Sequence, residues 1–172
     1  MDDSVDRVLA QWRTARPDLD PSPMGVIGRL SRASRLTERA LQKVFTEHGL
    51  QPGEFDILAT LLRAGGPRGM TAGALAASAM VTSGAITNRI DRLVTKALVT
   101  RDTDPANRRT VLIDLTPSGR ELINRAVADH LTNEERLLDA FSPRQREKFT
   151  SLLRTLLISL GDEYHLNPPP SR

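Results

Sequence analysis

The chain contains no cysteine. This absence excludes disulfides, thiolate metal sites and thiol-based redox sensing together. Aromatic residues make up only 3% of the 172 residues, and the abundant Leu and Ala favour helices over a β-sandwich. No apolar run approaches the roughly 20 residues that a membrane-spanning helix needs. The acidic start, residues 1–12, lacks the apolar segment of a signal peptide. We therefore expect a cytoplasmic protein with no membrane partner.

The sequence also has little that points to catalysis. His48, His130 and His165 are scattered and share no motif. No glycine-rich phosphate loop follows a predicted strand, and no Ser–His–Asp or paired-carboxylate pattern is discernible. We therefore expect no catalytic residue, no metal site and no cofactor. An enzyme remains the weakest of the functional hypotheses, and a nuclease or hydrolase assay tests it directly.

Charge is distributed unevenly along the chain. The formal net charge is +3, which gives only a mild preference for polyanionic partners. Residues 80–110 carry three acids and six bases, namely Arg89, Arg92, Lys96, Arg101, Arg108 and Arg109. This basic segment is where a nucleic-acid contact is expected.

Pairs of a hydroxyl residue and a proline mark several helix starts. They occur at 22–23, 116–117 and 142–143, where a capping hydroxyl precedes a first-turn proline. With the apolar periodicity, these signals predict helices at 3–15, 23–47, 52–64, 72–79, 83–97, 117–140 and 143–161, and strands at 99–103 and 109–115. We expect a single domain over 1–172, with a disordered tail at 167–172.

Residues 71–116 carry the most specific pattern. They form two short predicted helices, then two strands joined by a charged tip. A helix followed by a basic β-ribbon is how a winged helix-turn-helix meets DNA. Ser83, Thr87 and Asn88 occupy the helix end that enters a major groove, and Arg108 and Arg109 lie at the tip, where a ribbon reaches a minor groove or phosphates. The alternative is an amphipathic helix with a solvated polar face beside an ordinary charged hairpin.

Other features extend this prediction. Asp104 is a candidate to brace one of the tip arginines by an ion pair. The last two predicted helices, 117–140 and 143–161, each carry an apolar stripe. Packing within the chain is one explanation of these stripes. The small DNA-binding region offers little core for two long helices to cover, so a self-complementary dimer interface is the preferred interpretation.

The stretch from residue 91 to residue 122 resembles the multiple-antibiotic-resistance regulator (MarR) family of bacterial transcription factors. The matching features are Asp91-Arg92-Leu93, Leu98-Val99, Asp104 with Arg108-Arg109, and Leu115-Thr-Pro-Ser-Gly119. The resemblance implies a mainly α fold with a small β-wing: a winged helix-turn-helix lobe at about 50–115 and a dimerisation region at about 1–48 and 116–162. It implies a homodimer, usually a repressor, on a pseudo-palindromic double-stranded DNA operator. The expected DNA-binding residues are Ser83, Thr87, Asn88, Arg92, Arg108 and Arg109.

Four further residues resemble the signature of the urate-responsive subfamily: Trp12, Asp56, Arg89 and Arg101. Arg89 stands where the family commonly has an apolar residue. The resemblance implies that Trp12 contacts the ligand, that the two arginines hold its negative charge, and that Asp56 pairs with an arginine when the site is empty, for which we expect Arg101. Guanidinium groups suit planar anions, so the expected effector is urate, xanthine or a tricarboxylate.

A ligand-independent regulator is the competing hypothesis. The same winged domain would then bind DNA constitutively. Trp12 would be a core anchor, Asp56 and Arg101 a structural ion pair, and Arg89 a phosphate contact.

Overall fold

A computed structural model describes residues 2–66, 68–79 and 86–162. The predicted tail at 167–172 and Ser83 lie outside the described residues. The chain divides into two compact units, residues 1–133 and 134–172, which are taken separately below. Among the described residues, no helix is long and apolar enough to cross a membrane.

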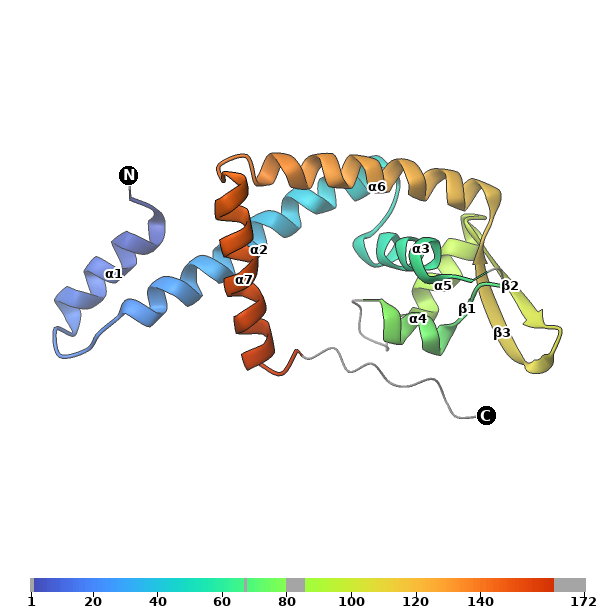
Figure 1. Ribbon diagram of the computed structural model, residues 1–172, viewed down its shortest axis with the longest axis horizontal. Coiled ribbons are helices and arrows are strands. Elements are labelled where there is room, and N and C mark those ends of the chain that lie inside the picture. The colour runs from blue at the N-terminus through green and yellow to red at the C-terminus, as the bar shows by residue number, and fades with distance from the viewer. Residues whose placement is uncertain (1, 67, 80–85, 163–172) are drawn as a thin grey trace. The chain divides into compact units, whose positions relative to one another are not determined.

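The first unit contains most of the secondary structure (Figure 1). Its helices are α1 (Ser4–Ala15), α2 (Ser22–Glu47), α3 (Pro52–Ala64), α4 (Ala72–Ser78), α5 (Ile86–Thr95) and most of α6 (Pro117–Leu137), and its strands are β1 (Met70–Thr71), β2 (Val99–Asp104) and β3 (Asn107–Leu115). The predicted mainly helical fold with a small β-wing is confirmed. The prediction missed β1, because two residues are too few for a strand pattern to register.

The three strands form one antiparallel sheet in the order β1-β3-β2. In the β2–β3 hairpin, Val99 pairs with Leu115 at the base, and the register shifts near the tip, between Thr103 and Asp104. We call the β2–β3 hairpin the wing, and α3, α4, α5 and the sheet the winged-helix unit. Pairing of β1 with the middle of β3 attaches the hairpin to the start of α4, so the wing has a fixed base and a free tip.

The core of the first unit lies between the sheet and helices α3, α4, α5 and α6. Its fully buried side chains include Ile57, Leu58, Leu61, Leu75, Ile90, Leu93, Ile113 and Ile123. Truncating one such side chain to Ala costs about 2–5 kcal/mol. Ile86, Ile90 and Leu93 form the buried face of α5, and this burial fixes which side of α5 remains outside.

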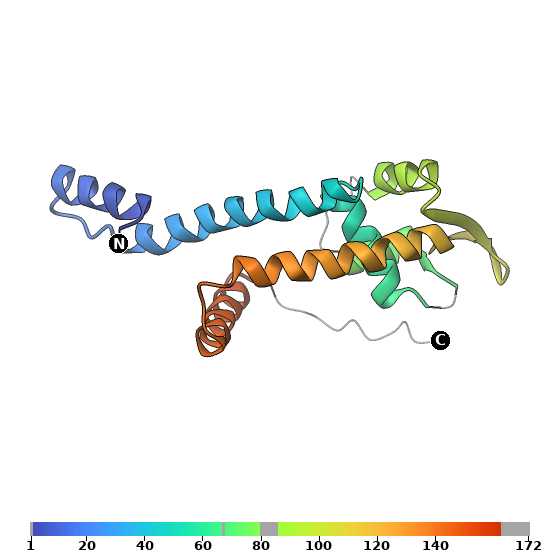
Figure 2. The same cartoon turned by 90° about the horizontal axis from the view of Figure 1, so that it is seen from above.

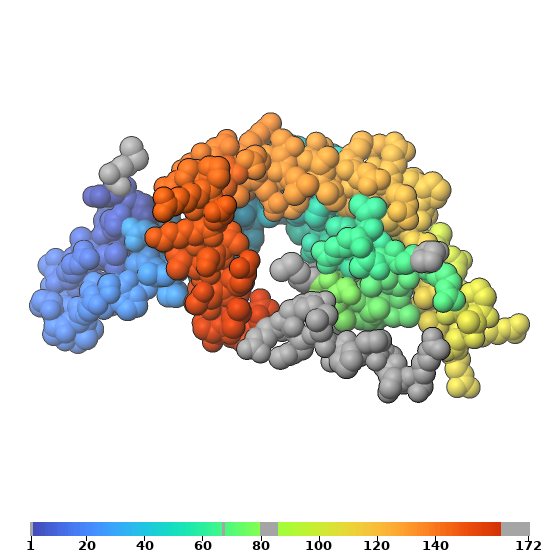
Figure 3. Space-filling view, viewed as in Figure 1, coloured from blue at the N-terminus to red at the C-terminus, as the bar shows by residue number. Residues whose placement is uncertain are grey.

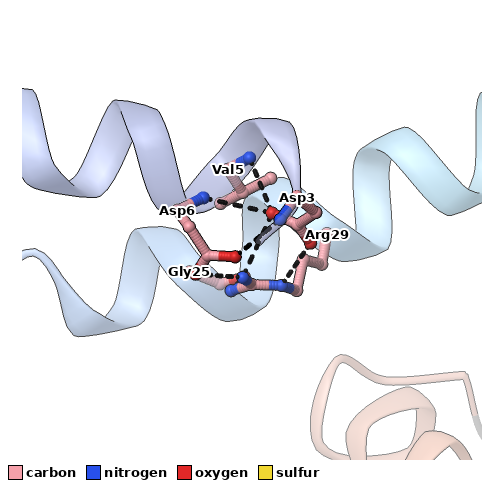
Figure 4. A network of polar contacts seen from close by, with 5 residues as sticks. All are labelled: Asp3, Val5, Asp6, Gly25 and Arg29. Carbon is pink, nitrogen blue, oxygen red and sulfur yellow. Dashed lines mark hydrogen bonds and ion pairs between the residues drawn. The ribbon is translucent and has the colours of Figure 1, made fainter. Parts of the chain in front are cut away.

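The N-terminal helix α1 packs on the first half of α2 (Figures 1 and 2). Val5 and Leu9 are buried there, against two glycines of α2, Gly25 and Gly28. Figure 4 shows the polar clamp beside them: the Arg29 guanidinium lies 2.8 Å from Asp3 and 2.6 Å from Asp6. α1 is thus fixed by both apolar and ionic contacts.

The second unit is built around α7 (Pro143–Ser159). The ring centroids of Phe141 and Phe149 stack 5.7 Å apart, and Arg146 lies 2.6 Å from Glu135. No residue of α7 is buried within this chain. Leu152 is 59% exposed and Leu160, just after the helix, is 73% exposed, so much of the predicted apolar stripe is uncovered within the second unit.

Candidate functional site

The outer face of α5 carries polar side chains. Thr87 and Asn88 are exposed, and Arg92 is 58% exposed at its side chain. These positions follow from the burial of Ile90 and Leu93, because at 100° per residue the polar residues fall on the other side of the helix. The structure therefore leaves these three predicted DNA-contacting side chains open to solvent, and the fourth predicted contact on this segment, Ser83, precedes the described part of the helix.

The wing projects beyond the helical core, as the yellow hairpin in the space-filling view shows (Figure 3). Its turn is built by side chains that accept backbone hydrogen bonds: Asp104 from the amide of Ala106 at 2.9 Å, and Asn107 from the amide of Arg109 at 3.1 Å. Arg108 and Arg109 are exposed, and within the described ranges neither has an ion-pair partner. Both guanidinium groups are free to bind an external anion.

The suggested brace between Asp104 and a tip arginine is wrong. The nearest cationic partner of Asp104 is Arg68, with Nη1 3.8 Å from Oδ1. Arg68 lies just before β1, whose pairing with β3 brings that segment alongside the wing. Arg68 and Asp104 are far apart in the sequence, so local sequence patterns could not predict this contact.

Arg89 folds inward against the first turn of α3. A Cβ atom placed on Gly53 would lie 2.5 Å from Arg89 Cζ, so the guanidinium rests on the space that the glycine leaves. Arg89 Nη1 is buried and has no hydrogen-bond partner among the described residues. The predicted inward direction of this arginine is confirmed, although it is half-buried rather than fully enclosed.

Asp56 lies nearby on α3 and is half-buried. Burial raises the pKa of its carboxyl above the usual value, while the charges of Arg89, Arg63 and His130 act in the opposite direction. The expected Asp56–Arg101 pair is wrong for this structure: Arg101 Nη1 lies 2.6 Å from Asp91 Oδ1 instead. Arg101 sits near the start of β2, which packs on α5, so the outward carboxylate of α5 is the closer partner.

Trp12 is not brought to Asp56 and Arg89 within one chain. It is 41% exposed and lies beside Leu19 and Met24, at the turn between α1 and α2. Asp56 is at the opposite end of α2, next to Phe55, which stacks on Phe45 with centroids 4.4 Å apart. Twenty-one residues of helix separate Met24 from Phe45, which at 1.5 Å per residue is roughly 30 Å.

A buried carboxylate at the start of α3 was not predicted. Glu54 is fully buried, with Oε2 2.7 Å from Lys96 Nζ and Oε1 3.8 Å from Arg92 Nε. Lys96 also donates a 2.9 Å hydrogen bond to the carbonyl of Gly49, so it joins the end of α5 to the α2–α3 junction. The available signal was the capping box in which Gln51 N–H donates to Glu54. Its burial under α5 could not be read from the sequence.

The raised pKa of Asp56 leads to a pH-dependent prediction. Its folded-state pKa lies above the unfolded value of about 4, so ionised Asp56 costs stability at neutral pH, and this cost disappears as pH falls below the ordinary carboxyl range. We expect Asp56→Asn to raise Tm at pH 7, with the gap to the wild type closing toward pH 4. Thermal unfolding across pH measures this, with the exposed Asp139→Asn as the charge-matched control. A gap that widens on acidification would contradict the assignment.

Known proteins resemble this chain in sequence and in fold. A sequence model of the MarR family matches residues 48–110. The HTH-type transcriptional regulator PecS of Dickeya dadantii is 43% identical over 149 residues, covering 87% of this chain and 90% of PecS. The chain belongs to the MarR family, and its named relatives are transcriptional regulators rather than enzymes.

Two solved structures illustrate the range of the fold. AbsC, a MarR family transcriptional regulator from Streptomyces coelicolor, superposes with a TM-score of 0.73 at 23% identity, covering 84% of this chain and 98% of AbsC. Bordetella bronchiseptica BpsR, whose DNA binding is regulated by 6-hydroxynicotinic acid, superposes with a TM-score of 0.65 at 25% identity, covering 74% of this chain and 89% of BpsR. The AbsC match covers more of this chain than the BpsR match. BpsR has the same fold and is regulated by a small carboxylic acid.

Proposed function

We propose that this protein is a transcriptional repressor that binds a pseudo-palindromic DNA operator as a homodimer. The observation that carries the proposal is the exposed polar face of α5 beside two wing arginines that have no ion-pair partner in the described part of the chain. In this arrangement α5 enters the major groove with Thr87 and Asn88 foremost, and the wing reaches the backbone or minor groove. The regulated DNA binding of BpsR supports the same use of the fold.

We further propose that a small anion such as urate, xanthine or a tricarboxylate releases the DNA. Arg89 supports this, because its Nη1 is buried with no hydrogen-bond acceptor among the described residues, which is energetically unfavourable. Asp56 lies close enough for its charge to interact with that of Arg89, and Arg101 becomes available to the ligand if it leaves Asp91. The fourth residue of the set, Trp12, completes the site only if a second chain supplies it.

The proposed coupling runs through Arg89. Its Cα is on the DNA-reading helix, while its guanidinium rests on α3. A ligand that attracts the guanidinium and repels the Asp56 carboxylate moves α5 relative to α3. Because the two half-sites of an operator must be met in register, a small shift of both recognition helices lowers affinity.

Wing contacts are tested by the salt dependence of DNA binding. Arg108→Ala and Arg109→Ala should each weaken binding and reduce the slope of log K against log salt by about 1, because each removes one phosphate contact. A duplex selected from random sequence by the wild-type protein serves as the target. Arg120→Ala, which removes an exposed arginine from α6, is the charge-matched control. Unchanged slopes in both wing variants would show that the wing does not touch DNA.

The competing hypothesis of a ligand-independent regulator remains open to a direct measurement. Trp12 is the single tryptophan, so its fluorescence reports one position. Titration with urate, xanthine and citrate should quench or shift the emission if the effector hypothesis holds. No change at millimolar ligand, together with unchanged operator affinity, would favour constitutive binding.

A further inference from the structure

A buried carboxylate joins the end of α5 to the rest of the winged-helix unit. Glu54 lies in the first turn of α3 and is fully buried. Its Oε2 accepts a 2.7 Å hydrogen bond from Lys96 Nζ and a 2.9 Å hydrogen bond from the Gln51 amide. Lys96, the residue that follows α5, also donates from Nζ to the Gly49 carbonyl at 2.9 Å. One polar link thus connects the end of α5 to the turn after α2 and to the start of α3.

The second oxygen of Glu54 faces another cation of α5. Oε1 is buried and has no hydrogen-bond partner among the described residues, and Arg92 Nε lies 3.8 Å from it. Arg92 and Lys96 are four positions apart, so they project from the same side of the helix. A carboxylate that attracts one cation with each oxygen resists both sliding of α5 along its axis and rotation about that axis.

Apolar packing does not supply the same constraint. Ile86, Ile90 and Leu93 determine which face of α5 is buried, but the hydrophobic effect has no preferred direction and tolerates small shifts of the helix. A buried ion pair is often no more stabilising than apolar side chains of similar volume. The role of Glu54 is therefore better explained by the geometry that it imposes than by stability.

We propose that Glu54 is a positioning residue for sequence recognition. Through Lys96 and Arg92 it fixes the orientation of α5 on α3, and so decides which bases the exposed end of the helix meets. The inference rests on the proposed function, because it requires that α5 reads DNA.

The distance between this link and the DNA-reading end of α5 amplifies small changes. Asn88 is exposed and lies eight residues before Lys96, which is roughly 12 Å along the helix. A tilt of about 10° at the Lys96 end therefore moves Asn88 by roughly 2 Å. Hydrogen bonds hold their donor–acceptor distances within a few tenths of an ångström, so such a movement breaks a contact to a base edge.

Glu54→Met tests this role with an uncharged side chain of similar length. Its affinity for a duplex selected by the wild type is compared with its affinity for a scrambled duplex of equal length. We expect the ratio of the two affinities to fall about 10-fold or more, because loss of one base contact costs this much discrimination. Partial unfolding would lower both affinities equally and leave the ratio unchanged. Glu121→Met, which breaks an exposed ion pair with Arg125 on α6, is the matched control.

The salt dependence of binding distinguishes positioning of α5 from an effect on Arg92 alone. In Glu54→Met the slope of log K against log salt should stay at the wild-type value, because no phosphate contact is removed. A slope lowered by about 1 with an unchanged affinity ratio would mean that Glu54 only directs Arg92, and the inference would be wrong.

A double variant keeps the test decisive if Glu54→Met does not fold. Glu54→Met with Lys96→Met removes both members of the buried pair and fills the space with apolar side chains, a replacement that folded proteins usually tolerate. A folded variant that discriminates between the two duplexes as well as the wild type does would contradict the inference and leave the proposed function intact. A wild-type protein that prefers no duplex would contradict both.

Discussion

A chain that ends after Ser142 is expected to be monomeric. This truncation removes α7, which buries no residue within its own chain and carries exposed apolar side chains at Phe149, Leu152, Leu157 and Ile158. An apolar stripe of this kind is unfavourable in water and is normally covered by a partner. Because each DNA half-site would then be bound independently, operator affinity should fall by about 10²- to 10⁴-fold.

Sedimentation equilibrium and DNA titration measure the two effects separately. The matched control is a chain that ends after Asp162, which keeps the whole of α7. Circular dichroism of the shorter chain checks that the winged-helix unit, whose core draws nothing from α7, remains folded. If the shorter chain still sediments as a dimer, the interface lies elsewhere.

Arg89→Ala is expected to separate DNA binding from effector release. The side chain points away from the exposed face of α5 and rests on Gly53, so its removal should change operator affinity little in the absence of ligand. The response to ligand should be lost, because the group that transmits it is gone. For a typical coupling of about 1–3 kcal/mol, the wild type should show a 5- to 150-fold loss of affinity with ligand, and the variant almost none.

Operator affinity with and without urate, xanthine or citrate gives this comparison. Arg120→Ala controls for the loss of one positive charge on the same unit. A variant that releases DNA in response to ligand as the wild type does would show that the signal does not pass through Arg89. A variant that fails to bind DNA even without ligand would make Arg89 a positioning residue for α5 instead.

Local chemistry allowed the helices and the wing to be predicted. Helix starts at Pro117 and Pro143 agree with the structure, because capping and proline preferences act over a few residues. The inward side of α5 was also predictable, since the 3.6-residue period places Ile86, Ile90 and Leu93 together. Arg89, at the edge of that face, could be recognised as unusual for the same reason.

Partner choice among charged side chains could not be predicted in this way. Asp56 and Arg101 have opposite charge, but Arg101 meets Asp91, and Asp104 faces Arg68 rather than the tip arginines. The predicted helix 23–47 already implied the roughly 30 Å that separates Trp12 from Asp56, but the resemblance assigned both residues to one site. Ion pairs depend on distances of a few ångströms between elements remote in sequence, which packing of the core sets.

The amino-acid sequence alone therefore determined the helices, the two strands of the wing, the buried face of α5 and the resemblance to the family, because each depends on short-range periodicity, capping or a contiguous motif. Tertiary structure alone decided that Glu54 is buried beneath Lys96, that Arg89 lies on Gly53, and that no residue of α7 is buried. These facts depend on how α3 and α5 pack together and on what the second unit leaves uncovered. Such contacts are set by three-dimensional packing, which no pattern of neighbouring residues encodes directly.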